Sequence, residues 1–156
     1  MRLLFVCTGN ICRSPTAEGV TRALLKQAGH DGRFHLDSAG LGGWHVGDPP
    51  DARAIRRAAA RGYDLSAQRA RQLTEGDFAD FDLLLAMDRG HRREMLRACP
   101  APLKDRIKLF MEYAEGPQAG DVPDPYYGDL ADFDHALDMV ERGARALVDR
   151  LTAPPP

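Results

Sequence analysis

The sequence has few cysteines and no long hydrophobic run. Three cysteines, an odd number, in 156 residues argue against a disulfide framework and favour free thiols in a reducing compartment. The first apolar run, at 3–7, is shorter than the roughly 7–15 residues of a secretory signal. Nothing approaches the ~20 apolar residues of a membrane span. We therefore expect a cytoplasmic protein without a membrane partner.

An excess of charge of one sign is also missing. The chain has 21 basic and 23 acidic side chains, and its formal charge is −2. A nucleic-acid-binding protein would show a basic patch or stripe, so we expect no such partner. The basic residues are 18 arginines and only 3 lysines, which favours bidentate recognition of anions. The five histidines lack metal-ligand spacing, so we expect them to be solvated and expect no metal. We also expect no cofactor and a monomeric protein.

Short apolar runs alternate with longer amphipathic segments, which indicates a parallel sheet covered by helices. We expect strands at 3–6, 34–38, 82–87 and 106–111, with helices at 51–61 and 88–98 and a last helix ending at Leu151. Ser14 is expected to cap the first helix, with Pro15 as its first residue. The prediction is one three-layer α/β domain, residues 1–151. Its four-stranded parallel sheet has flavodoxin-like order with helices on both faces, and 152–156 form a flexible tail.

The loop after the first strand has the residues for chemistry. It reads Cys7-Thr8-Gly9-Asn10-Ile11-Cys12-Arg13-Ser14, a C-x5-R-S pattern between a strand and a helix. In open parallel sheets, ligands bind at the carboxyl ends of the strands. The following helix N-terminus and the Arg13 guanidinium both favour an anion, so we expect Cys7 to be a thiolate at neutral pH.

Five residues between Cys7 and Arg13 let the backbone curl with its N–H groups inward, forming a cup for phosphate or vanadate-like anions. Gly9 tolerates a close approach, and Asn10 accepts a positive φ. Arg13 can hold two oxygens of the anion. This arrangement predicts metal-independent, in-line attack of the thiolate on phosphorus. The predicted phosphate-binding residues are Thr8, Gly9, Asn10, Ile11, Cys12 and Arg13.

The same motif resembles that of a known family. CTGNICRSPTAE at 7–18 and DPYYGD at 124–129 are similar to the low-molecular-weight protein-tyrosine phosphatases, as are segments 37–54, 70–74 and 86–88. The similarity covers essentially the whole chain. The C-x5-R-S element occurs in several phosphatase folds, but its combination with DPYY is specific. The resemblance implies hydrolysis of phosphotyrosine in proteins, and of aryl phosphates, through a cysteinyl-phosphate intermediate.

The resemblance also implies catalytic roles. Cys7 is then the nucleophile and Arg13 the phosphate clamp. Asp124 is then the general acid that protonates the leaving tyrosyl oxygen, and afterwards the base that deprotonates the attacking water. The first role needs a protonated carboxyl, which nearby phosphate charge favours.

Supporting and substrate-binding positions follow from the same resemblance. Ser14 is expected to hydrogen-bond the sulfur of the nucleophile, while Asn10 and Ser38 hold the loop in shape. Many family members have a histidine where this chain has Gln68, so the support of Asn10 at this position stays open. A deep aromatic cleft for the substrate ring is expected to be lined by Ile11, Trp44, Tyr126 and Tyr127.

Several alternatives remain open. Cys12 either protects Cys7 from over-oxidation through a reversible disulfide, as the resemblance suggests, or simply packs behind the loop. Cys99, beside Pro100 and after a helix, is expected to be structurally incidental. A thiol-dependent arsenate reductase needs relay cysteines, and none lies between Cys12 and Cys99. Phosphoarginine phosphatases related to this family have a threonine in place of Ile11. A non-catalytic phosphate sensor would have no use for Asp124.

Overall fold

Four parallel strands form the centre of the computed structural model, which describes residues 1–155. The strands are β1 (Arg2–Cys7), β2 (His35–Gly40), β3 (Leu83–Ala86) and β4 (Ile107–Leu109). All their pairings are parallel, and the order in the sheet is β2-β1-β3-β4. This order confirms the predicted α/β fold with its four-stranded, flavodoxin-like sheet.

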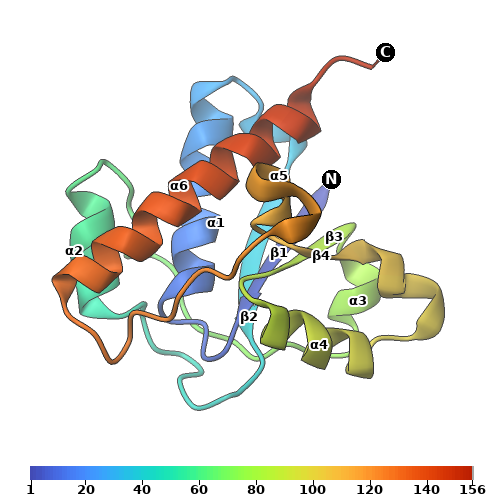
Figure 1. Cartoon of the computed structure of the whole chain (residues 1–156), viewed down its shortest axis with the longest axis horizontal. Coiled ribbons are helices and arrows are strands. Elements are labelled where there is room, and N and C mark those ends of the chain that lie inside the picture. Colours follow the sequence, from blue (N-terminus) through green and yellow to red (C-terminus); the bar gives the residue numbers. More distant parts are fainter. Residues whose placement is uncertain (156) are drawn as a thin grey trace.

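Helices cover both faces of this sheet. In Figure 1, α1, α2 and α6 gather on one side of the strands, and α3 and α4 on the other. Residues 3–7 of β1 and all of β3 are buried, so the alternating side chains of both strands meet packed neighbours on either face. The helices are α1 (Arg13–Gln27), α2 (Ala52–Ala59), α3 (Asp77–Asp80), α4 (Arg89–Ala98), α5 (Glu112–Glu115) and α6 (Leu130–Thr152).

The largest helix, α6, packs on one face of the sheet and covers part of the core. Phe5 of β1 and Phe110 after β4 are fully buried, and their rings meet edge to face at 6.0 Å. Gly143 of α6 passes so close to Phe110 that an added Cβ would lie 2.4 Å from its ring. The buried stripe of α6 contains Phe133, Leu137, Val140, Ala144 and Leu147, as its helical spacing predicts.

The prediction that Ser14 caps the first helix was wrong. Helix α1 begins one residue earlier, at Arg13, and its N-cap residue Cys12 makes no side-chain capping bond. The Ser14 hydroxyl instead faces back into the loop, where it meets the side chains of Cys7 and Asn10. The Ser14 hydroxyl is therefore engaged with Cys7 and Asn10 and does not cap the helix.

Several element boundaries also differ from the expected ones. Strand β2 extends to Gly40 because Gly40 pairs with Cys7 at the end of β1. Short 3-10 helices occupy Asp31–Arg33, Ala101–Arg106 and Gly116–Gln118, where the sequence showed only loop signals. Helix α6 includes Thr152, whose hydroxyl donates to the Val148 carbonyl, so the expected tail loses its first residue. Pro156, in the same tail, lies outside the described residues.

No helix within residues 1–155 is long and apolar enough to cross a membrane.

Candidate active site

Three loops meet at the carboxyl end of the sheet: residues 8–12 after β1, 41–51 after β2, and 119–129 before α6. Figure 1 shows them together at the lower end of the molecule. They enclose a cleft of about 370 Å³. The structure thus brings the predicted catalytic and cleft residues together. The cleft is lined by Cys7, Thr8, Gly9, Ile11, Cys12, Arg13, Trp44, His45, Asp124, Tyr126 and Tyr127.

The phosphate loop, residues 7–13, turns its carbonyl groups outward. The carbonyls of Cys7 and Thr8 accept hydrogen bonds from the backbone N–H groups of Leu41 and Gly42, at 2.9 Å each. The Ile11 carbonyl accepts from the Asp51 N–H at 2.8 Å. Within residues 1–155, no protein group accepts the N–H groups of residues 8–12. An inward ring of free N–H groups is a site for a phosphate-like anion.

Asn10 fixes the shape of this loop. Its φ of +60° is the one left-handed backbone angle of a non-glycine residue within 1–155. Its side-chain N–H groups donate to the hydroxyls of Ser14 and Ser38, at 2.8 and 2.9 Å. The Ser14 oxygen lies 3.0 Å from the Cys7 sulfur. Because Asn10 supplies a donor to Ser14, the Ser14 proton is free to point at Cys7 and stabilise a thiolate.

Gln68 makes no hydrogen bond to Asn10, which answers the question that the sequence left open at this position. Its amide nitrogen donates to the Pro15 carbonyl at 2.8 Å, which braces the first turn of α1. The side-chain amide oxygen of Asn10, Oδ1, instead accepts the Arg71 backbone N–H at 3.0 Å. The Arg71 guanidinium is held in turn by the carboxylates of Asp37 and Asp77. A flexible carboxamide at position 68 reaches the helix, and the 70–74 segment supports Asn10.

Arg13 is buried beside the cup with its guanidinium fixed by two acceptors. One nitrogen, Nη1, donates to the Asp88 carboxylate at 2.9 Å and to the Val122 carbonyl at 3.1 Å. The other, Nη2, faces the Thr8 hydroxyl at 3.3 Å and the Asp124 carboxylate at 3.7 Å. No role was expected for Asp88, although it lies in segment 86–88, which is similar to the family. The sequence signal that could have indicated a role is its position just after β3, because ligands bind at the carboxyl ends of parallel strands.

His91 is buried, contrary to the expectation that the histidines are solvated. Its Nε2 lies 2.8 Å from the Thr8 hydroxyl and 3.4 Å from Nη2 of Arg13. Burial and the Arg13 charge lower its pKa to about 4, so the ring is neutral at pH 7. Since Arg13 can only donate, Nε2 accepts and the Thr8 hydroxyl donates to it. The pair fixes Thr8 beside the guanidinium.

Asp124 lies at the rim of the cup with its side chain 44% exposed. One of its oxygens accepts the Tyr126 N–H at 3.1 Å, and the other faces Arg13. A carboxyl at the rim, opposite the sulfur at the base, is placed to exchange a proton with a leaving group that points out of the cup.

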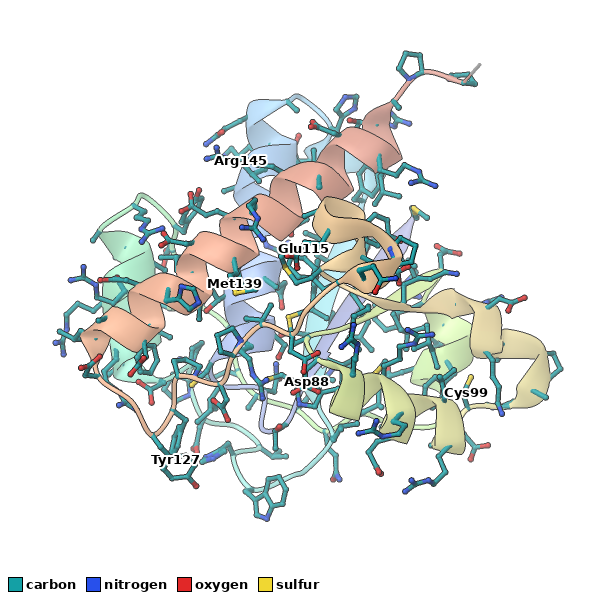
Figure 2. The ribbon with its side chains drawn as sticks, viewed as in Figure 1. Asp88, Cys99, Glu115, Tyr127, Met139 and Arg145 are labelled. Carbon is teal, nitrogen blue, oxygen red and sulfur yellow. The ribbon has the colours of Figure 1, made fainter. Side chains whose placement is uncertain are left out.

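The aromatic walls of the cleft are more open than expected. Trp44 is 74% exposed, Tyr127 is 93% exposed and Tyr126 is 37% exposed. The rings of the two tyrosines meet edge to face at 4.9 Å. Figure 2 shows Tyr127 projecting from its loop away from the body of the molecule. The predicted residues Ile11, Trp44, Tyr126 and Tyr127 do line the cleft. Trp44 follows two glycines in an exposed loop, so the cleft is open and not a deep aromatic slot.

Cys12 and Cys99 are buried free thiols. Burial, together with the charges of Asp51, Cys7 and Asp124, raises the pKa of the Cys12 thiol, so it does not compete with Cys7 as a nucleophile. Cys12 also lines a small void of about 20 Å³ beneath the loop. Within residues 1–155, no group of three His, Cys, Asp or Glu side chains is placed to hold a metal ion.

Comparison with known proteins identifies the family. The model of the family described as low molecular weight phosphotyrosine protein phosphatase matches residues 2–154. This chain belongs to that family. It is 45% identical over 152 residues to a Synechocystis protein named as a putative low molecular weight protein-tyrosine-phosphatase, covering 97% of this chain and 96% of the relative.

Solved structures agree with this assignment. A protein tyrosine phosphatase of Entamoeba histolytica with Hepes in its active site superposes with a TM-score of 0.92, at 35% identity. The match covers 97% of this chain and 96% of the other. The arginine phosphatase YwlE of Bacillus subtilis, solved with a phosphorylated active-site serine, gives a TM-score of 0.89 at 28% identity, covering 98% and 97%.

Proposed function

We propose that this protein hydrolyses phosphotyrosine in proteins, and aryl phosphates, through a covalent intermediate on Cys7. The observation that carries the proposal is the buried Cys7, which lines the cleft beside Arg13 in a loop whose N–H groups at 8–12 have no acceptor within residues 1–155. Family membership and the protein tyrosine phosphatases among the structural neighbours support the substrate class.

In the first step, the Cys7 thiolate attacks phosphorus in line with the tyrosyl oxygen. The S–P bond forms while the P–O bond breaks, and the protonated Asp124 gives its proton to the leaving phenol. The loop N–H groups and Arg13 hold the three equatorial oxygens, where negative charge is spread in the transition state. Because these donors supply the positive field, the step needs no metal.

In the second step, water attacks the phosphorus of the cysteinyl phosphate. Asp124, now ionised, takes a proton from this water, and the S–P bond breaks to release phosphate and the thiolate. The Ser14 hydroxyl, 3.0 Å from the sulfur, stabilises the departing thiolate by a hydrogen bond. The roles of Asn10 and Ser38 are to hold Ser14 and the loop in this geometry.

The shape of the cleft favours an aromatic phosphoester. A phenyl ring fits between Ile11 and Trp44 on one side and Tyr126 and Tyr127 on the other, with its phosphate in the cup. Phosphoarginine hydrolysis, the activity named for YwlE, is the second candidate. Ile11 argues against it, because a branched apolar side chain that lines the cleft packs on a ring and cannot hydrogen-bond a guanidinium. We place the protein in the cytoplasm as a monomer that acts on phosphotyrosine proteins and not on nucleic acid.

The proton-donor role of Asp124 is the most specific part of this proposal to test. In Asp124→Ala, kcat/KM should fall about 100-fold or more for phenyl phosphate and phosphotyrosine peptides, whose leaving groups need a proton. It should fall less than about tenfold for p-nitrophenyl phosphate, whose leaving group is stable as an anion. Steady-state kinetics with all three substrates measure this difference.

A matched control is Asp121→Ala in the same loop. Its carboxylate accepts the Arg89 backbone N–H and does not line the cleft, so both kinds of substrate should be affected alike and slightly. Equal losses for all three substrates in Asp124→Ala would remove this residue from the acid role. Faster turnover of a phosphoarginine peptide than of a phosphotyrosine peptide by the wild-type protein would favour the second candidate.

A further inference from the structure

The segment that carries Asp124 is anchored to the body of the molecule at two places. On its N-terminal side, the Val122 carbonyl accepts from the Arg13 guanidinium, and the Val122 N–H donates to the Met87 carbonyl at 3.0 Å. On its C-terminal side, the anchor is Arg53 of α2. Arg53 donates to the Tyr126 carbonyl at 2.9 Å and to the Gly128 carbonyl at 3.3 Å.

Arg53 is the principal anchor at the C-terminal side of this segment. Within residues 1–155, Arg53 is the only side chain from outside the segment that hydrogen-bonds to the backbone of residues 123–128. The other bonds there are internal: the Asp124 carboxylate accepts the Tyr126 N–H, and the Gly128 N–H donates to the Pro125 carbonyl. A movement at Tyr126 is therefore passed directly to the Asp124 carboxylate.

Arg53 is itself tied to the phosphate loop through Asp51. The Asp51 carboxylate accepts from the Arg53 backbone N–H at 2.8 Å and from its guanidinium at 2.9 and 3.1 Å. The Asp51 N–H in turn donates to the Ile11 carbonyl. A continuous chain of bonds thus joins Ile11, through Asp51 and Arg53, to Tyr126 and Gly128.

Packing fixes the guanidinium in this place. Its central carbon lies 4.5 Å from the centre of the buried Phe133 ring and 5.7 Å from that of Tyr126. The guanidinium lies over two aromatic rings and donates hydrogen bonds in its own plane. This arrangement uses the flat, forked shape that distinguishes arginine from lysine. The Arg53 guanidinium makes four side-chain hydrogen bonds in this position.

We infer that Arg53 is a positioning residue, which holds residues 124–128 against the phosphate loop and thereby sets Asp124 opposite Cys7. The inference rests on the proposed function of Asp124. It assigns to α2 a part in proton transfer, although no side chain of α2 lines the cleft. Loss of such a positioning residue should lower kcat/KM for substrates whose leaving group needs a proton. Binding of the anion in the phosphate loop should not change.

The test compares Arg53→Gln with Arg61→Gln. Arg61 also holds the α2 region against α6, through Asp138 and Glu141, but it has no bond to residues 123–128, so it controls for lost stability. In Arg53→Gln, kcat/KM for phenyl phosphate should fall about tenfold or more, because a misplacement of about 1 Å can cost about 100-fold. For p-nitrophenyl phosphate, the change should stay within about threefold, and inhibition by vanadate should stay within about twofold of wild type.

Two further comparisons separate positioning from a general structural effect. In the Asp124→Ala background, Arg53→Gln should cause no further loss beyond about twofold, since both changes remove the same proton transfer. Arg53→Lys keeps the charge without the fork, so it should share the defect of Arg53→Gln. Equal losses for both aryl phosphates, an additive loss in the Asp124→Ala background, or full rescue by lysine would overturn the inference.

Hydrogen exchange provides a readout that does not depend on turnover. Peptides covering 123–128 should exchange faster in Arg53→Gln than in wild type, and at the wild-type rate in Arg61→Gln. An unchanged rate in Arg53→Gln overturns the inference even if the enzyme is active. A wild-type protein that turns over no aryl phosphate would instead contradict the proposed function.

Discussion

At the scale of single residues, the site depends on neighbours that hold a few reactive groups in one arrangement. Arg13 shows this most clearly. It is buried, and hydrogen bonds to Asp88, Val122 and Thr8 determine how its guanidinium is oriented. A guanidinium fixed in this way loses little freedom when it binds an anion, which favours tight binding.

His91 is the titratable member of this group, and its burial should show in the pH dependence of stability. Burial and Arg13 lower its pKa to about 4 from 6.5, while the charges of Asp88, Asp124 and Asp121 oppose this shift. Between these values the unfolded chain binds more protons than the folded one, so stability falls as the pH drops from 6.5 towards 4. Above pH 6.5 the contribution of His91 is constant.

We predict that this histidine accounts for about 2 kcal/mol of lost unfolding free energy between pH 7 and pH 5. In His91→Gln that part of the loss should disappear, because glutamine does not titrate. Urea unfolding of both proteins at the two pH values gives the difference. Parallel losses in the two proteins would show that His91 is not held neutral in the folded state.

At the scale of elements, the position of the phosphate loop depends on a close contact with the end of β2. Gly40 pairs with Cys7 across the sheet and lies directly under the loop. A Cβ at Gly40 would lie 2.9 Å from the Gly9 carbonyl carbon and 3.0 Å from the Thr8 oxygen. These are backbone atoms, so the loop itself would have to move.

Gly40→Ala should therefore distort the cup as well as cost stability. We expect a loss of about 1–3 kcal/mol, typical of overpacking, and vanadate inhibition weakened about tenfold, because displaced N–H donors no longer match the anion. Gly32→Ala is the control, since its Cβ would meet nothing within 4 Å. Urea unfolding and vanadate inhibition constants measure both effects. Wild-type vanadate affinity in Gly40→Ala would contradict this view of the contact.

The elements also show what sequence patterns can and cannot predict. Each strand and long helix appeared in the sequence as an apolar run or a helical stripe, because burial of one chain segment is a local property of its residues. The supporting contacts are not local. Gln68 and Arg71 lie three residues apart, and only the folded geometry shows that Arg71, through its backbone N–H, bonds to Asn10.

The arginine stripe of α2 is a similar case. Arg53, Arg57 and Arg61 recur at helical spacing, a pattern that is typical of a solvated helix face. In the structure they bond to the Asp124 segment, to Asp134, and to Asp138 and Glu141 respectively. Their partners lie more than 70 residues away along the chain, so charge spacing within α2 held no information about them.

At the scale of the whole molecule, the fold brings three distant segments to one edge of the sheet. The nucleophile and clamp come from the loop after β1, one wall of the cleft from the loop after β2, and the acid from the loop before α6. The motif residues themselves were predictable, because their chemistry requires those residue types at those spacings. Asp88, His91 and Arg53 were not, since each acts by holding another group in place.

The proposed reaction depends on transfer of phosphate to Cys7, and trapping of the cysteinyl phosphate is the decisive experiment. Wild-type protein mixed with a 32P-labelled aryl phosphate and quenched in acid within the first turnovers should retain label on the peptide that contains Cys7. Cys7→Ser should show no aryl phosphate turnover, and Cys12→Ser should still trap the label. Label on another residue, or turnover that persists in Cys7→Ser, would show that Cys7 is not the nucleophile.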